Sequence, residues 1–296
     1  MPIPLWLLAL SILLLSLSSG SSAVAAPATL TLLATSPWNM HYADDSCMLM
    51  REFGSAKSKM FLRIEKTAPG EYFSITLIGR PLGWDDGVTT PITLTFGPGG
   101  VPDKRDRAPI GLGTIGERLP LVIVERTSLY GRPKESLLEE AARGPDAEAK
   151  YTQLLVDRKG KADFVLQLGP MDKPMAALRT CTDDLVKGWC LDPAIQGALQ
   201  RRVAPTESPG TWLRPFDYPD KALVGGKSAI IRFRLVIDAS GLVTSCSVPS
   251  ATKNEGFEGI TCDLLKKRAR FEPALDGAGK PVASYYVNSV TWLMTN

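Results

Sequence analysis

Five cysteines are the residues whose chemistry most constrains this chain of 296 residues. Thiols of exported proteins tend to oxidise, and an odd number of them leaves one without a partner. We predict a Cys246–Cys262 disulfide, because the two are close in sequence and fall in one predicted small domain. Among the other three we favour Cys47–Cys181, which would join an N-terminal strand to a helix and leave Cys190 free, while Cys181–Cys190 remains open.

Residues suited to catalysis or metal binding are few. His41 is the single histidine, so a zinc site would need cysteines and carboxylates, and a Ser-His-Asp triad would depend on this residue. The pairs Asp44-Asp45 and Asp85-Asp86 fall in predicted turns without a His or Cys cluster nearby, which favours solvated turns. We therefore predict no catalytic residue, no metal site and no cofactor.

Residues 111–116 read Gly-Leu-Gly-Thr-Ile-Gly, which matches the dinucleotide fingerprint as a string. That motif needs a strand before it and a helix after it. Here the charged run 103–107 precedes it, and Leu119-Pro120 leads into a predicted strand. We predict a glycine-rich loop and no bound nucleotide.

The overall charge is also uninformative about partners. With 34 Lys and Arg against 31 Asp and Glu, the net charge of +3 is too small to predict a nucleic-acid groove. The basic run Lys266–Arg270 falls at the predicted end of a helix, where cations complement the helix dipole. We predict no nucleic-acid partner.

The N-terminus has the layout of a secretory signal peptide. Residues 5–17 are almost wholly apolar, but shorter than the roughly 20 residues that span a bilayer. Small residues at 23–26 then provide a peptidase site, so residues 1–26 are predicted to be removed and the rest delivered to an oxidising periplasm. An uncleaved inner-membrane anchor is the alternative, because no Lys or Arg precedes the apolar run.

The elements predict an α+β fold, with an N-terminal antiparallel β-rich domain over residues 27–201. Its predicted strands alternate or are β-branched, and they cover 60–65, 72–78, 92–96, 121–124 and 164–168. One or two short helices, broken at Gly144-Pro145, are predicted within 134–155. A further helix is predicted over 174–189.

A Pro- and Ser-rich linker over residues 202–215 is predicted to lead into a second domain, 216–296. Apolar and charged residues alternate over 231–238, which indicates a strand with one buried face. Asp238-Ala239-Ser240-Gly241 predicts a hairpin turn. A strand over 242–248, a helix over 256–270 and a long strand over 282–293 complete a β-β-α-β order.

This second segment carries a pattern of several short motifs in a fixed order. The motif residues are Tyr218, Pro219, Asp238, Gly241, Phe271, Pro273 and Ala274. The pattern resembles the C-terminal domain of the TonB energy-transducer family, over about the last eighty residues. The resemblance implies a periplasmic domain whose exposed strand pairs with a short peptide of outer-membrane transporters, which is β-augmentation.

By that resemblance the final strand is the candidate partner-binding element. Its residues are Tyr285, Tyr286, Val287, Asn288, Ser289, Val290, Thr291 and Trp292. We expect a periplasmic binding protein whose partner is an envelope protein or peptide, with an outer-membrane transporter as one candidate. The alternatives are an anchored energy transducer and an envelope enzyme with its site in the N-terminal domain. An exposed edge strand also allows a homodimer.

Overall fold

The computed structural model describes residues 29–131, 145–249 and 256–293. The predicted signal peptide and the predicted helical segment up to residue 144 lie outside these residues. Within the described ranges, no helix is both long enough and apolar enough to cross a membrane.

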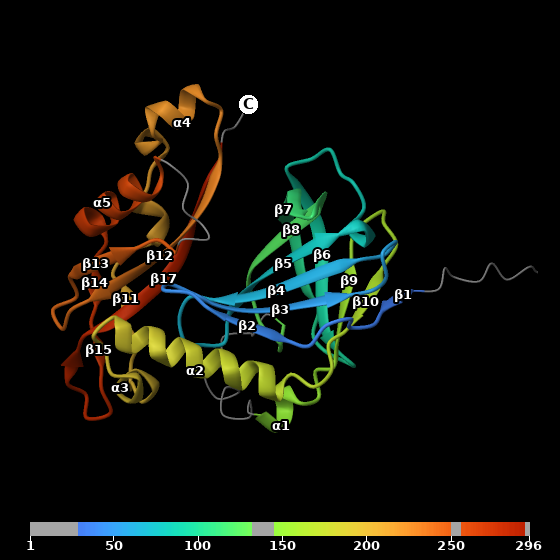
Figure 1. Ribbon diagram of the computed structural model, residues 1–296. Coiled ribbons are helices and arrows are strands. Elements are labelled where there is room, and N and C mark those ends of the chain that lie inside the picture. Colours follow the sequence, from blue (N-terminus) through green and yellow to red (C-terminus); the bar gives the residue numbers. More distant parts are fainter. Residues whose placement is uncertain (1–28, 132–144, 250–255, 294–296) are drawn as a thin grey trace, which may run out of the picture.

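A large curled sheet of ten strands forms the N-terminal part, in the order β1-β10-β9-β6-β7-β8-β5-β4-β3-β2 (Figure 1). The strands are β1 Leu30–Leu32, β2 Asn39–Tyr42, β3 Cys47–Phe53, β4 Met60–Lys66, β5 Phe73–Gly79, β6 Thr89–Gly97, β7 Asp103–Ile115, β8 Glu117–Thr127, β9 Gln153–Asp157 and β10 Phe164–Gln167. All neighbours are antiparallel except β1 and β10. An Ala34–Phe53 bridge brings the two ends of the sheet together.

The core of this sheet follows from its alternating apolar residues. On β4, Met60, Leu62 and Ile64 are fully buried on one face, as a period of two requires. The 3-10 turn Arg80–Leu82 follows β5. The β4–β5 connection, residues 67–72, extends toward the C-terminal part of the chain (Figure 1).

The helix α2, Asp172–Gly188, runs from the N-terminal sheet toward the C-terminal part (Figure 1). Its apolar stripe packs on the sheet through Met175, Leu178 and Leu185, at helical spacing. The Cys47–Cys181 disulfide joins it to β3, and this is the pairing that the sequence favoured. Because the bond closes a loop across 134 residues, the chain-entropy model gives about 5 kcal/mol of stabilisation. The short α1, Pro145–Glu148, and α3, Pro193–Gly197, flank it.

The C-terminal part is a three-stranded sheet in the order β13-β12-β17, with α5 against it. Its elements are β11 Ala204–Pro205, the 3-10 turns Pro209–Thr211 and Pro215–Asp217, α4 Asp220–Val224, β12 Ala229–Ile237, β13 Val243–Ser247, α5 Glu258–Arg268, β14 Phe271–Glu272, β15 Ala274–Leu275, β16 Pro281–Val282 and β17 Ser284–Trp292. The predicted β-β-α-β order and the α+β class are confirmed. The Cys246–Cys262 bond, also predicted, joins β13 to α5.

Aromatic side chains fill the C-terminal core. Trp212, Phe257, Phe271 and Trp292 are buried and pack against one another and their neighbours. Trp212 comes from the segment predicted as a linker, and β11 of that segment pairs with β14. Residues 202–215 are therefore packed against the C-terminal sheet over much of their length.

Two local predictions were wrong. Leu154, predicted on a helix, is fully buried on β9, because pairing with β6 and β10 outweighs local helix preference. The glycine-rich segment 111–116 is not a loop: it forms the end of β7 and the turn into β8 at Gly116, whose φ is 73°. The charged run before it is strand as well, and its buried Asp103 carboxylate accepts two hydrogen bonds from Arg105.

Candidate functional site

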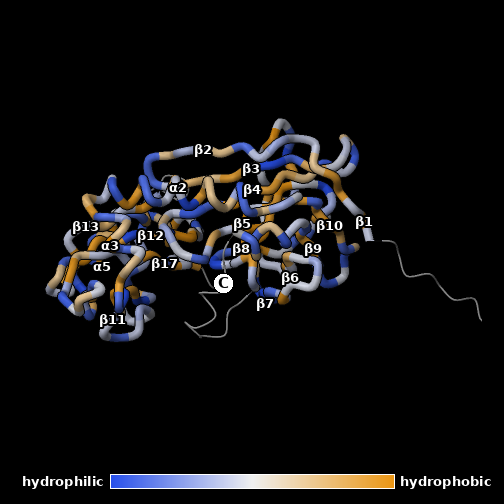
Figure 2. The backbone as a smooth tube through the Cα atoms, turned by 90° about the horizontal axis from the view of Figure 1, so that it is seen from below, coloured by the Kyte–Doolittle hydropathy of each residue, from blue (hydrophilic) through white to orange (hydrophobic). Residues whose placement is uncertain are grey.

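The central strand β12 has two chemically different faces. Ile231, Phe233 and Leu235 point into the C-terminal core. Arg232 and Arg234 point the other way, toward the N-terminal sheet, and both are more than nine-tenths buried. Figure 2 shows β12 and β17 beside β5 and β8, at the boundary between the two parts of the chain.

Arg232 binds two carboxylates of the N-terminal sheet. Its Nη1 donates to Glu65 Oε2 at 2.8 Å, and its Nη2 donates to Glu125 Oε1 at 2.5 Å. Burial lowers the pKa of the Arg232 guanidinium, but the bonds to Glu125 and Glu65 outweigh burial and raise that pKa above its ordinary value. The Arg232 guanidinium therefore stays charged at every physiological pH, and its bonds to the two carboxylates dock the two parts of the chain.

Arg234 makes the second contact across this boundary. Its guanidinium lies 4.2 Å from the ring centre of Trp189, which follows α2, and Trp189 in turn packs edge-on against Tyr285 at 5.1 Å. Burial lowers the pKa of Arg234, and the nearby charge of Asp45 opposes that effect. The stack links α2 to both β12 and β17.

Among the residues that the structure describes, β17 pairs with β12 alone, along one of its two edges. In an antiparallel pair, alternate residues turn their backbone groups outward. Two hydrogen bonds show which residues of β17 do so. The Ser289 amide donates to Asn288 Oδ1 of its own strand. The Val236 carbonyl accepts a bond from Thr244 Oγ1 of β13, so Val236 turns its backbone groups away from its β17 partner, Tyr285. The amides of Tyr285, Val287 and Ser289 therefore face away from β12.

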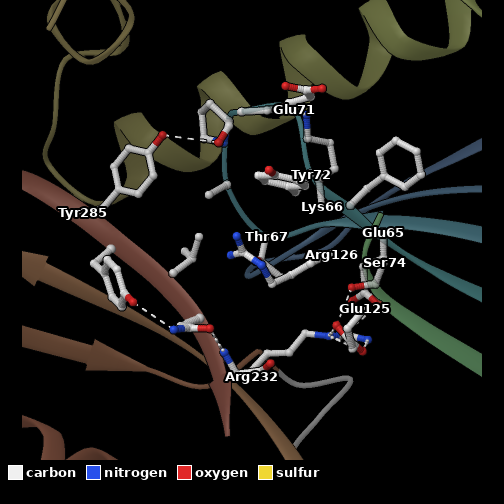
Figure 3. Close-up of a pocket in the computed structure, with 18 of the residues that line it drawn as sticks. Glu65, Lys66, Thr67, Glu71, Tyr72, Ser74, Glu125, Arg126, Arg232 and Tyr285 are labelled. Atoms are coloured by element: carbon white, nitrogen blue, oxygen red, sulfur yellow. Dashed lines mark hydrogen bonds and ion pairs between the residues drawn. The ribbon is translucent and has the colours of Figure 1, made fainter. Parts of the chain in front are cut away.

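A cleft of about 600 Å³ lies along this outward edge (Figure 3). Residues 285–289 of β17 form one wall, and the opposite wall comes from β4, β5, their connection and the end of β8. Arg202 and Val203, from the segment that joins the two parts of the chain, complete the lining of the cleft. The cleft therefore combines an unpaired strand edge with side chains of the N-terminal sheet.

Polar groups in the cleft are held in place by the surrounding backbone. The Tyr285 hydroxyl donates to the Pro69 carbonyl at 3.5 Å, and Lys66 Nζ donates to the Gly70 carbonyl. Burial lowers the Lys66 pKa to about 8. Burial also raises the pKa of both Tyr285 and Tyr286, partly opposed by Arg202 for the first and by an Asn288 hydrogen bond and Arg126 for the second.

Comparison with known families identifies one part of the chain. Residues 214–293 match the family model described as Gram-negative bacterial TonB protein C-terminal. This segment is a TonB C-terminal domain. Such domains serve energy transduction and protein interaction and are not enzymes, which supports an envelope protein with a protein partner. The comparison with curated proteins gave no match.

The motif residues of the TonB C-terminal domain lie in a turn, in the core and beside the ends of helices and strands. Asp238 Oδ1 accepts hydrogen bonds from the amides of Ser240 and Leu242, and Gly241 has a φ of 87°. Phe271 is buried beside Trp212, and the Tyr218 hydroxyl donates to the Lys227 carbonyl. Pro219 precedes α4, Pro273 separates β14 from β15, and Ala274 is fully buried. None of these residues lines the cleft.

The predicted partner-binding strand divides into two parts. Residues 285–289 line the cleft, whereas Val290, Thr291 and Trp292 lie beyond it. Trp292 is buried, and its indole N–H donates to Thr261 Oγ1. We therefore narrow the proposed binding edge of the TonB C-terminal domain to residues 285–289.

The other candidate residues lie apart from this cleft. His41 is exposed on β2, at the edge of the large sheet. Asp85 forms an ion pair with Arg158. The Asp44-Asp45 turn lies near Arg234, in a second cavity between the N-terminal sheet and β12. Among the described residues, no three His, Cys, Asp or Glu side chains are grouped in a way that could hold a metal ion. Cys190 is a free, exposed thiol.

Sequence reasoning missed the cleft wall that the N-terminal sheet provides. Lys66, Tyr72, Glu125 and Arg126 come from three different strands or turns and lie up to sixty positions apart in the chain. No motif links them. Only the charged residues on β12, Arg232 and Arg234, were visible in the sequence, as the polar face of an alternating strand.

Proposed function

We propose that this protein is a periplasmic peptide- or protein-binding protein of the cell envelope, and that it binds an extended segment by strand pairing along β17. The observation that carries the proposal is the outward backbone edge of residues 285–289, which forms one wall of an open cleft. An extended peptide gains main-chain hydrogen bonds from such an edge, and side-chain pockets add specificity.

A single added strand is the arrangement that the free edge of β17 would accept. Neighbouring strands lie about 4.8 Å apart, so a paired peptide would occupy the space between β17 and the β4–β5 connection. Both walls would then contact it. The N-terminal sheet would act as part of the binding site, besides serving as the support to which the TonB C-terminal domain is docked.

Two variants at one position test strand pairing. Val287→Pro removes an outward amide donor and should fold, because proline is tolerated on an edge strand where its nitrogen faces away from the sheet. Val287→Ala keeps the amide and removes only the side chain. The probe is a fluorescein-labelled heptapeptide library of β-branched residues, with binding measured by fluorescence anisotropy on the mature protein.

We expect Val287→Pro to weaken library binding about tenfold or more, and Val287→Ala to weaken it less than threefold. Equal binding by the wild type and Val287→Pro would refute strand pairing at this edge. Circular dichroism checks that both variants are folded.

The compartment separates this proposal from an anchored energy transducer. Residues 1–26 have a signal-peptide pattern, and the two disulfides suit an oxidising compartment. We expect N-terminal sequencing of the protein from fractionated host cells to give a soluble periplasmic product beginning near Ala26 or Pro27. An intact Met1 in the inner-membrane fraction would instead favour the transducer.

A further inference from the structure

A β-bulge on β8 shapes the wall of the cleft opposite β17. Phe73 pairs with Thr127 and Ile75 pairs with Val124, so Glu125 and Arg126 together oppose the single residue Ser74. A bulge of this kind turns side chains away from the regular alternation, and bulges are common beside functional sites. Here it directs Glu125 to Arg232 and Arg126 into the cleft (Figure 3).

The backbone at Arg126 is held in an uncommon conformation. Its φ is 51°, and in the described residues only Arg126 and Cys190 have positive φ without being glycine. That conformation costs roughly 1 kcal/mol for a residue with a Cβ. The Arg126 carbonyl accepts a 2.7 Å hydrogen bond from Arg105 Nη2, and the strand pairing on either side fixes the bulge. A glycine would relieve the strain but would supply no side chain.

The Arg126 guanidinium has no carboxylate partner among the described residues. It lies over the Tyr72 ring, with its central carbon 4.7 Å from the ring centre, which orients its plane and leaves its N–H groups available. Arg202, which lies near Tyr285 in the segment between the two parts of the chain, likewise forms no ion pair within the described part of the chain. Both arginines are exposed.

The acidic groups of the cleft are already engaged. Glu65 and Glu125 bind Arg232, and Glu71 accepts a hydrogen bond from Ser128. The cleft therefore offers a strand edge together with two uncompensated positive charges, which fit a negatively charged group on the bound segment. An arginine fork donates two parallel hydrogen bonds to a carboxylate, and such charge-assisted bonds are about twice as strong as neutral ones.

We propose that Arg126 of the N-terminal sheet recognises a carboxylate side chain of the peptide that pairs with β17, so that the protein selects acidic extended segments. This inference depends on the proposed strand pairing and adds the chemistry of the partner to it. The N-terminal sheet then supplies specificity, while β17 supplies affinity that is independent of side-chain charge.

Two matched peptide libraries test the selection. Both are fluorescein-labelled heptapeptides of β-branched residues; one carries Glu at the central position and the other Gln. Anisotropy titrations use the full mature protein and its Arg126→Gln variant. Arg118→Gln is the control, because Arg118 is an exposed arginine of the same strand outside the cleft.

We expect the wild type and Arg118→Gln to bind the Glu library about tenfold more tightly than the Gln library, and Arg126→Gln to bind both equally, at the affinity of the Gln library. Retention of the Glu preference by Arg126→Gln, or equal binding of both libraries by the wild type, would overturn carboxylate recognition and leave strand pairing intact. If neither library bound the wild type, strand pairing and carboxylate recognition would both fail.

Discussion

Buried charge is the most informative feature at the scale of single residues. Lys66, Arg232 and Arg234 are each more than nine-tenths buried, yet they differ in how the charge is compensated. Arg232 has two carboxylates, Arg234 has an aromatic ring, and Lys66 has a backbone carbonyl. Burial and the charge of Arg179 lower the Lys66 pKa, and the charges of Glu148, Asp183 and Glu71 only partly oppose them, so the Lys66 ammonium costs stability.

The pH dependence of stability should reveal this cost. The Lys66 pKa falls from 10.5 to about 8 on folding, so between those values the unfolded chain binds more protons, and stability from this group rises with pH. Lys66→Met should therefore increase the free energy of unfolding more at pH 7.5 than at pH 10. Urea unfolding at both pH values measures this difference.

A comparison at an exposed lysine isolates the effect of burial. Lys57→Met changes an ammonium that remains in water, so its effect on the free energy of unfolding should be the same at both pH values. If Lys66→Met also gave the same change at pH 7.5 and pH 10, the account of a desolvated ammonium at this position would be wrong.

At the scale of elements, the β12–β13 hairpin shows how the motif of the TonB C-terminal domain acts. Gly241 has a φ of 87°, and a Cβ built there would lie 2.0 Å from the Phe271 carbonyl oxygen. The Gly241 carbonyl accepts a hydrogen bond from the Phe271 amide. Two parts of the motif that lie thirty residues apart are thus in direct contact.

This contact predicts a large effect of one methyl group. Gly241→Ala should reduce the free energy of unfolding by about 3 kcal/mol or more, because backbone must move to relieve the overlap. Gly226→Ala is matched, since Gly226 also has positive φ but has nothing within 4 Å of the added Cβ. Its expected loss is about 1 kcal/mol. Equal losses in urea unfolding would mean that the contact with Phe271 is not a constraint.

Elements with strong local patterns could be predicted from the sequence, and those formed by distant pairing could not. The alternation of residues 231–237 and the turn after it gave β12 and its hairpin. Leu154 sits beside a helical pattern, and only its pairing with β6 and β10 makes it part of a strand. The binding site divides in the same way. The role of β17 could be predicted from the resemblance to a known family. The position of Arg126 in the opposite wall of the cleft could not, because it depends on a bulge that has no local sequence pattern.

At the scale of the whole molecule, the docking of the TonB C-terminal domain onto the N-terminal sheet creates the cleft. Arg232 with Glu65 and Glu125, and Arg234 with Trp189, hold β12 against the sheet and α2. Because β17 neighbours β12, the same contacts set the distance between its free edge and the opposite wall. Binding and docking should therefore weaken together.

Arg232→Met tests this link. Within the described part of the chain it leaves the buried Glu65 carboxylate with Arg63 alone, at 3.6 Å. We therefore expect a loss of about 3 kcal/mol in the free energy of unfolding and weaker peptide-library binding. Arg201→Met removes an exposed pair with Glu272 and should cost less than about 1 kcal/mol, with binding unchanged. If a destabilised Arg232→Met protein bound the library normally, the claim that docking by Arg232 shapes the cleft would be wrong.

The most direct test of strand pairing is residue-resolved amide hydrogen exchange of the mature protein, with and without a saturating heptapeptide drawn from the β-branched Glu library. We expect the outward Val287 amide of β17 to exchange at least tenfold more slowly in the complex, while the amides of β13, at the opposite edge of the sheet, are unaffected. Unchanged exchange at Val287 in the presence of bound peptide would contradict strand pairing in the cleft.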